Sequence, residues 1–439
     1  MSLRTLSQNK FSAKRYNTTN KVYAKYWSAY VSGASVYGNA SGSAFKHLAV
    51  DSTGAIYSVG TTNLGSGSDD ALLIKFDTSG SLVWQKALGQ SGISDSGNSI
   101  VIDSSDNIFI CGTNGTGPFL AKYDTSGNLI AQTRVTPVTN TSISPQCMDV
   151  NNSTGQIYLG GWYTNSSGYY YGLIQRYGSD LSLLNMKIWG SNTSGTNPYN
   201  HGIIIDQSTG DFYVSGYRQT GSAIMVGKFS ADTTAVWAYT YNLGVAYQLG
   251  ISGDGYIYVV GSYGSSSSTP FLTKINSSGA VIWTRRLTGI VASGLSLSFD
   301  LYGNIFIATN SNAANNYNVY IAKFNDIGDL LWQNYIDGPN SDQPVGIICD
   351  VKGDIIFTIY DITNAKITLF HLPGDGSLNN ASYNSGVNYG YYPSSLVLNT
   401  TTVFTPTLFT ATLSTQVPAA TQPLISQTVS HTISTLVIG

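Results

Sequence analysis

The sequence predicts an all-β protein, a seven-bladed β-propeller closed by an N-terminal strand and followed by a C-terminal β-rich extension. A unit of four short strands recurs seven times along the 439 residues, and the seventh copy is incomplete. One basic position recurs every 46 to 54 residues, at Lys75, Lys122, Arg176, Lys228, Lys274, Lys323 and His371. Four strands in a period near 50 residues are typical of a propeller blade.

Within each copy, the order of elements follows from turn residues and alternation. An apolar strand leads through an Asp-x-x-Gly turn into an "IYxxG" strand, as in "HLAVDSTGAIYSVG". A variable loop, an alternating strand, a second Asp-opened turn and a Trp strand complete the copy. The Trp follows the Lys by nine residues in four copies, at Trp84, Trp237, Trp283 and Trp332. One carboxylate per turn is too few for a calcium ion, so we assign these Asp residues to turn formation.

The chain ends supply the closure. The seventh copy breaks off at "LFHLPGDGS" without its Trp strand, whereas "YAKYWSAYVSG" precedes the first copy and contains Trp27. We therefore expect residues 23–33 to pair with the strand at 365–372, which removes an exposed sheet edge. The recurring basic residue is expected to be structural, its ammonium reaching turn carbonyls or the Asp two residues later, rather than to bind phosphate.

Composition excludes several classes of protein. With 42% hydrophobic and 10% charged residues the chain can bury a core, and its longest apolar runs are too short for membrane insertion. A net charge of −2 gives no reason to expect nucleic acid binding. The first residues lack the apolar segment of a signal peptide. Three cysteines spaced far apart are interpreted as small buried residues rather than disulfides.

Charge divides the chain into three parts: a basic N-terminal arm at residues 1–20, the propeller at 21–377 and an uncharged extension at 378–439. The first 50 residues contain seven basic residues and no acidic one. The last 64 residues contain no Asp, Glu, Lys or Arg, yet they are rich in Thr and β-branched residues. Uncharged strands favour association, so we expect the extension to serve docking or oligomerisation.

The stretch "ALLIKFDTSGSLVWQKALGQSGISDSGNSIVIDSSDNIFICGTN" resembles the bacterial beta-propeller repeat family. The resemblance covers approximately residues 22–376 and implies the propeller architecture, without a catalytic signature. Copy two departs from the pattern by lacking the Trp, copy three by an insertion, and copy seven by lacking both the Lys and the Gly.

The junction "HLPGDGS" and the Tyr- and Asn-rich segment after it resemble propeller-containing virion structural proteins of marine bacteriophages. This resemblance implies a non-enzymatic structural or attachment protein, made in the host cytoplasm and located in the virion. Its expected partners are other virion proteins and a host-surface glycan, within a homo-oligomer or a multi-protein assembly. The alternatives are a cell-surface or secreted carbohydrate-binding propeller and, third, a propeller lyase or hydrolase.

No chemistry-bearing motif is recognisable. The four histidines lie in separate repeats or in the tail, without the spacing of metal ligands. Glu never occurs, and most of the 23 Asp residues open turns. We therefore expect no catalytic residue, no metal site and no cofactor.

The binding face is predicted from the loops. In a four-stranded blade the two Asp-x-x-Gly turns share one face. The connections between strands two and three and those between blades, expected to be long and variable, share the other face. Binding residues concentrate on variable loops held by a rigid scaffold. Aromatic and Arg side chains follow the strand-ending Gly of three successive copies, at Trp162, Tyr163, Tyr217, Arg218 and Tyr263. We expect them to form an aromatic ridge that binds a protein or a sugar.

Overall fold

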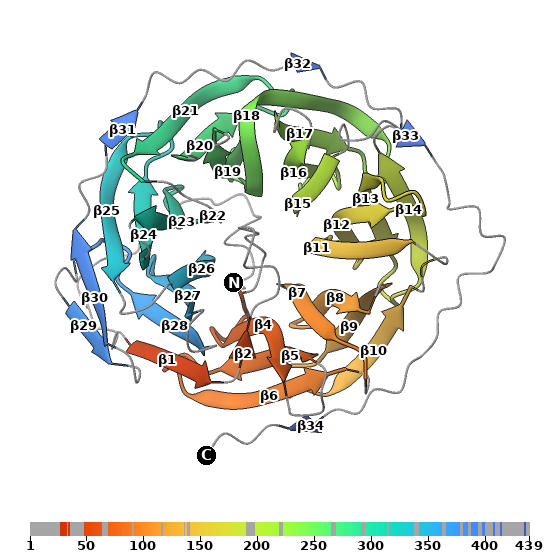
Figure 1. Cartoon of the computed structure of the whole chain (residues 1–439), viewed down its shortest axis with the longest axis horizontal. Coiled ribbons are helices and arrows are strands. Elements are labelled where there is room, and N and C mark those ends of the chain that lie inside the picture. Colours follow the sequence, from red (N-terminus) through yellow and green to blue (C-terminus); the bar gives the residue numbers. More distant parts are fainter. Residues whose placement is uncertain are drawn as a thin grey trace.

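The computed structural model describes residues 27–32, 34–35, 48–63, 69–89, 92–115, 117–135, 137, 141–189, 198–218, 223–264, 269–290, 295–313, 316–337, 342–361 and 366–377, together with six short strands beyond residue 377. Every regular element in these ranges is a strand, and the strands form seven blades around a ring (Figure 1). The predicted seven-bladed β-propeller is confirmed. The basic arm at 1–20 lies outside the described residues.

The blades are built in chain order, each from its inner to its outer strand. Blade 1 contains β3 (Leu48–Val50), β4 (Ile56–Asn63), β5 (Asp69–Phe76) and β6 (Leu82–Leu88). Blade 2 contains β7 (Asp95–Ile102), β8 (Ile108–Asn114), β9 (Gly117–Tyr123) and β10 (Leu129–Arg134). Blade 3 contains β11 (Ser142–Val150), β12 (Ile157–Thr164), β13 (Tyr170–Tyr177) and β14 (Leu183–Trp189). Blades 4 and 5 contain β15 (Pro198–Ile205), β16 (Phe212–Arg218), β17 (Ala223–Phe229), the long β18 (Ala235–Ile251) that they share, β19 (Ile257–Tyr263), β20 (Thr269–Ile275) and β21 (Val281–Thr288).

Blade 6 contains β22 (Leu295–Phe299), β23 (Ile305–Ala313), β24 (Asn316–Phe324) and β25 (Leu330–Asp337). Blade 7 contains β26 (Asp342–Cys349), β27 (Ile355–Asp361), β28 (Lys366–Leu372) and, as its outer strand, β1 (Trp27–Ser32). The short β2 (Ala34–Ser35) pairs with the end of β4. Antiparallel pairing of β1 with β28 runs from Trp27 opposite His371 to Ser32 opposite Lys366. The N-terminal strand therefore closes the ring, as the sequence predicted.

Asp-opened turns join the first two strands of the blades. In blade 1 the Asp51 carboxylate accepts backbone N–H bonds from Thr53 and Ala55, at 2.9 and 3.0 Å. Gly54 closes this turn with a φ of 90°, a conformation that costs glycine little. Burial works to raise the pKa of Asp51, but hydrogen bonds from Thr53 and Tyr57 outweigh it and hold that pKa below its usual value. The predicted role of these Asp residues in turn formation is confirmed here.

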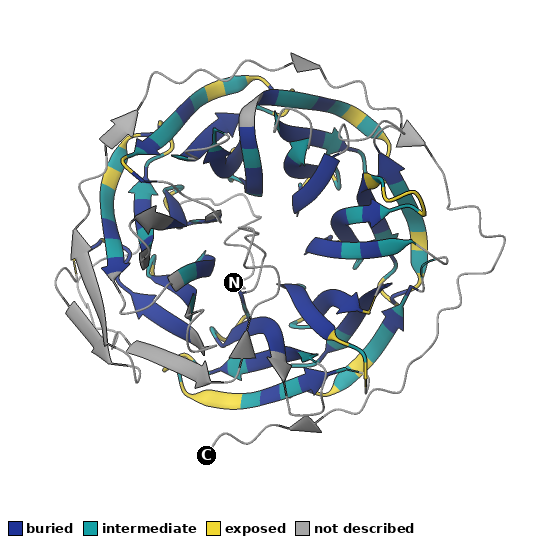
Figure 2. Ribbon diagram, viewed as in Figure 1, coloured by how far each residue is buried: buried dark blue, intermediate teal, exposed yellow. Residues whose placement is uncertain are grey.

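The core lies between neighbouring blades. Inner strands are almost wholly buried, whereas exposed residues gather along the outer strands (Figure 2). Facing apolar side chains from adjacent blades fill the space between them; for example, Val101 and Phe109 of blade 2 belong to one cluster with Met148 and Leu159 of blade 3. The three cysteines are buried and unbonded to one another, as predicted.

The described strands of the C-terminal extension lie along the outer circumference of the ring (Figure 1). Its strands β30 (Asn388–Pro393), β31 (Val397–Asn399), β32 (Thr407–Leu408), β33 (Leu413–Ser414) and β34 (Ser434–Thr435) add to the outer strands of blades 6, 5, 4, 3 and 1, while β29 (Ala381–Asn384) pairs with β30. Each outer-edge ladder contains two to four residue pairs. The extension thus contacts this chain's own blades. Its role in docking to other chains stays a prediction.

Candidate functional site

Two of the predicted binding residues meet across the boundary between blades 3 and 4. Trp162, near the end of β12, and Tyr217, near the end of β16, are both half-buried. Each contacts Tyr199 of the inner strand β15, with ring centroids 5.5 Å and 4.9 Å away, and the Tyr217 ring is stacked on it at an interplanar angle of 7°. Tyr170 lies 5.1 Å from Tyr199 on the outer side and is 37% exposed.

A histidine lies within this group. His201 follows Tyr199 by two residues on β15, and its ring is 6.2 Å from Trp162, 5.5 Å from Tyr217 and 5.9 Å from Tyr247 of β18. We call these six residues the aromatic cluster: Trp162, Tyr170, Tyr199, His201, Tyr217 and Tyr247. Strands β12 and β16 leave the Asp-opened turns at their other ends, so the cluster lies towards the opposite face of the ring.

His201 is the most unusual member of the cluster. It is 7% exposed, and neither of its ring nitrogens has a hydrogen-bond partner. Burial lowers the pKa of His201 to about 4, so the imidazole is neutral at physiological pH. A buried polar group without a partner costs about 1–3 kcal/mol and calls for an explanation, and a bound ligand would supply one.

The other predicted residues are placed differently. Tyr163 points to the opposite side of β12 from Trp162, is 6% exposed and packs 6.1 Å from Tyr171 within the core. Arg218 is half-buried at the end of β16. In blade 5 the guanidinium of Arg286 lies 4.2 Å above the Tyr263 ring. The structure therefore joins Trp162 and Tyr217 through Tyr199.

The connections on this face are shorter than the sequence suggested. Between the second and third strands they contain two to five residues, no more than the Asp-opened turns. For these connections the prediction of long loops was wrong, because the alternating strands extend almost to the hairpin. These connections vary in their residues more than in their length.

Glycines shape the backbone beneath the aromatic cluster. Inner strand β15 carries a bulge between Asn200 and Gly202, directly opposite Gly216. A Cβ on Gly216 would lie 2.8 Å from the carbonyl carbon of Tyr199 and nearer still to its oxygen. Blades 2, 3 and 5 repeat this arrangement of a bulge opposite the Gly of "IYxxG". Bulges bend a strand and re-aim side chains, so this Gly positions the start of β15.

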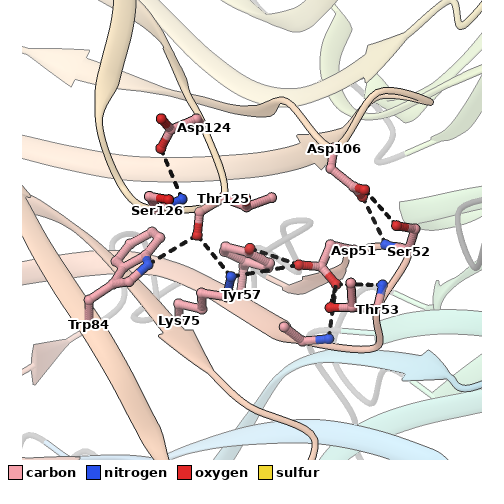
Figure 3. Close-up of polar contacts among 11 residues, drawn as sticks. Asp51, Ser52, Thr53, Tyr57, Lys75, Trp84, Asp106, Asp124, Thr125 and Ser126 are labelled. Atoms are coloured by element: carbon pink, nitrogen blue, oxygen red, sulfur yellow. Dashed lines mark hydrogen bonds and ion pairs between the residues drawn. The ribbon is translucent and has the colours of Figure 1, made fainter.

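The recurring Lys and Trp have a different role, at the opposite face. In Figure 3, Lys75 Nζ and Trp84 Nε1 donate hydrogen bonds to one acceptor, the Thr125 carbonyl of the next blade, at 2.8 and 3.3 Å. Lys75 and Trp84 are cross-strand neighbours, which explains their spacing of nine residues. Blades 5 and 6 repeat this pair of bonds. Lys274 and Trp283 donate to the backbone carbonyl of Asp326, and Lys323 and Trp332 donate to the backbone carbonyl of Gly374. The residues thus join blades.

The carboxylate near the lysine is not the one expected from the sequence. Lys75 Nζ lies 3.8 Å from Asp51, which opens the first turn of the same blade. The predicted partner two residues later, Asp77, accepts backbone N–H bonds from Ser79 and Ser81 instead. Lys75 thus lies between the first turn of its own blade and the second turn of the next blade. Both kinds of Asp-opened turn therefore lie on one face of the ring.

One group of side chains in the described residues could hold a metal ion, although no metal site was predicted. Potential ligand atoms of Asp350, Asp354 and His371 lie within 4.8 Å of one another. Sequence spacing did not suggest this site, because β27 separates the two carboxylates from a histidine on β28. Burial raises the pKa of Asp354 above its usual value.

The sequence prediction considered only residues after the strand-ending Gly, so it missed four members of the aromatic cluster: Tyr170, Tyr199, His201 and Tyr247. The sequence did contain a signal for Tyr199. Every inner strand starts on the face opposite the Asp-opened turns, and Tyr199 stands at the start of its inner strand, before the apolar run. The part of the chain that the structure describes contains no helix with the length and hydropathy of a membrane span.

The comparison with protein families agrees with the architecture. Residues 83–117 match the model of the beta-propeller repeat. No curated protein matches the chain. Similar solved structures include the Dos1 propeller, with a TM-score of 0.46 at 10% identity over 74% of this chain and 82% of that one. A protein from Lactobacillus plantarum gives 0.44 at 12% over 73% and 97%.

A puromycin hydrolase mutant complexed with PGG gives a TM-score of 0.48 at 9% identity over 72% of this chain and 50% of that one. By its sheet topology the chain is a seven-bladed β-propeller, and its residues 83–117 match the beta-propeller repeat.

Proposed function

We propose that this chain is a non-enzymatic structural or attachment protein of a bacteriophage virion, with the propeller as its interaction platform. The observation that carries the binding role is the aromatic cluster. Tyr170 and the half-buried Trp162 and Tyr217 present aromatic surface on the face opposite the turns that join the blades. Aromatic side chains of this kind are enriched among the residues that dominate binding energy.

The virion role is supported by the resemblance at "HLPGDGS" and by the extension that follows it. Along the rim, that extension covers the outer edges of five blades with strands that contain no charged residue. Covered edges resist unwanted strand pairing, which suits a protein packed at high local concentration in a particle. The non-enzymatic part of the proposal is supported by turn carboxylates such as Asp51 and Asp77, which are engaged in hydrogen bonds of their own turns.

Mass spectrometry of purified particles tests the virion role. Peptides of this chain should copurify with the capsid and tail proteins through a density gradient, and absence from the particles would overturn the proposal. Antibody labelling then distinguishes its three candidate places, which are capsid decoration, a tail-associated adaptor and a fibre component. Other virion proteins are the first expected partners.

A carbohydrate-binding propeller of the cell surface is the second candidate, favoured by one observation. Flat aromatic faces stack on sugar rings, and His201 lies among them with both ring nitrogens unpartnered. A glycan array should detect binding by the wild-type chain and not by a Trp162→Ala, Tyr217→Ala variant. Tyr302→Ala is the matched control, since Tyr302 is 82% exposed in an Asp-opened turn on the other face. Equal binding by both variants would refute the assignment of this site.

A further inference from the structure

Blade 7 departs from the repeat at its basic position, where His371 replaces lysine. Blade 4 is its nearest counterpart, because Asp206 and Asp211 hold the same places in the first turn as Asp350 and Asp354. In blade 4, Lys228 Nζ lies 2.9 Å from Asp211, so an ammonium compensates that carboxylate. Blade 7 retains both carboxylates and has an imidazole in place of the ammonium.

The separation of His371 and Asp350 fits two ligands of one ion. His371 Nε2 lies 3.3 Å from Asp350 Oδ2, and the ligand atoms of all three side chains lie within 4.8 Å of one another. Two ligands, each about 2.1 Å from a zinc ion, are about 3.0–3.4 Å apart at angles between right and tetrahedral. Side-chain exposure is only 9% for His371 and 14% for Asp350.

Backbone donors fix both carboxylates, and in Asp350 they leave one oxygen facing the imidazole. Asp350 Oδ1 accepts N–H bonds from Lys352 and Asp354 at 2.8 and 2.9 Å, so Oδ2 is the oxygen that faces His371. Asp354 Oδ1 accepts from the Gly374 N–H at 3.2 Å. Such hydrogen bonds orient metal ligands and strengthen binding.

We propose that Asp350, Asp354 and His371 bind one divalent transition-metal ion, with Zn²⁺ as the best match. One imidazole nitrogen with two carboxylate oxygens is a donor set that suits zinc, whereas calcium and magnesium prefer oxygen alone. Three protein ligands leave a fourth position for water. The site adjoins the ring closure, because His371 on β28 pairs directly with Trp27 of β1. This inference is independent of the proposed virion role.

Isothermal titration of the chelator-treated, dialysed full chain with ZnCl₂ tests the site. One ion per chain should bind, and bound zinc should raise the melting temperature. His371→Lys restores the residue of the other blades, so it should fold and melt like the metal-free wild type yet show no binding at this site. Asp354→Asn should weaken binding at least tenfold. Co²⁺ should give visible absorption bands with wild type and none with His371→Lys.

Two results would overturn the inference. One is the lack of saturable one-to-one binding by a folded wild-type chain. The other is unchanged zinc affinity and cobalt absorption in His371→Lys, because the metal would then lie elsewhere on the chain.

Discussion

Replacing Gly216 by alanine should damage the backbone that supports the aromatic cluster. The added Cβ would lie 2.8 Å from the carbonyl carbon of Tyr199 and 3.2 Å from Cα of Asn200, and closer than 3.0 Å to the Tyr199 oxygen. All three atoms belong to the backbone, so no side-chain rotation relieves the overlap. The bulge of β15 must therefore move, and Tyr199 moves with it.

The size of the effect follows from two opposing contributions. Overpacking a well-packed interior costs about 1–3 kcal/mol. The smaller conformational freedom of alanine in the unfolded chain offsets about 0.4–1 kcal/mol of that. We expect the free energy of unfolding of Gly216→Ala to fall by about 1–2 kcal/mol, with weaker ligand binding because the stack of Tyr199 on Tyr217 is displaced.

Urea denaturation followed by tryptophan fluorescence measures this change. Gly346→Ala is the matched control, since its Cβ would meet only the Leu48 side chain at 3.6–3.8 Å, which is ordinary contact. The control should differ from wild type by less than about 0.5 kcal/mol. Coincident denaturation midpoints for the two variants would refute the reasoning about the bulge.

Three further predictions concern closure, an ion pair within blade 6, and pH. Deleting residues 1–35 removes β1 and exposes the edge of β28, so light scattering should detect aggregation; a soluble monomer with an unchanged melting temperature would contradict the closure. Lys323→Met removes the ammonium that lies 3.0 Å from the Asp300 carboxylate, whose side chain is only 1% exposed. The free energy of unfolding in urea should fall by about 3 kcal/mol, whereas Lys352→Met, at an exposed position, should leave it unchanged. Equal losses in the two variants would contradict the ion pair. Because burial lowers the pKa of His201 from 6.5 to about 4, the unfolded chain takes up this proton first, and on the order of 3 kcal/mol of stability should be lost as the pH falls from 6.5 to 4. His201→Gln should flatten that part of the profile, and an unaltered slope would argue against it.

The blade architecture was predictable because its determinants recur. Lys75 and Trp84 keep their spacing in three other blades, and in two of these, as in blade 1, both side chains reach one carbonyl of the next blade. Asp51 recurs because its carboxylate accepts the N–H bonds of the turn. Tertiary requirements that repeat seven times leave a period in the sequence. The predicted closing strand came from the same logic, as a missing copy of a known element.

The candidate sites were harder to predict because they occur once. In the sequence, His371 is simply the one copy of the basic position that is not Lys or Arg. Only the pairing of β27 with β28 shows that it lies beside Asp350. Tyr199 and His201 precede the apolar run of their strand, and only the ring geometry shows that they meet Trp162. The rim strands of the extension form ladders as short as two residue pairs, too short for an alternation to be visible.

The rim ladders determine how the chain responds to a pulling force. Tension applied at the C-terminal end loads β34 first, then β33, β32, β31 and β30, one blade at a time. Such short ladders rupture one after another at low force, and each rupture releases slack of about 3.5 Å per freed residue. The extension would thus lengthen and dissipate mechanical work before any inner strand of the ring carries load.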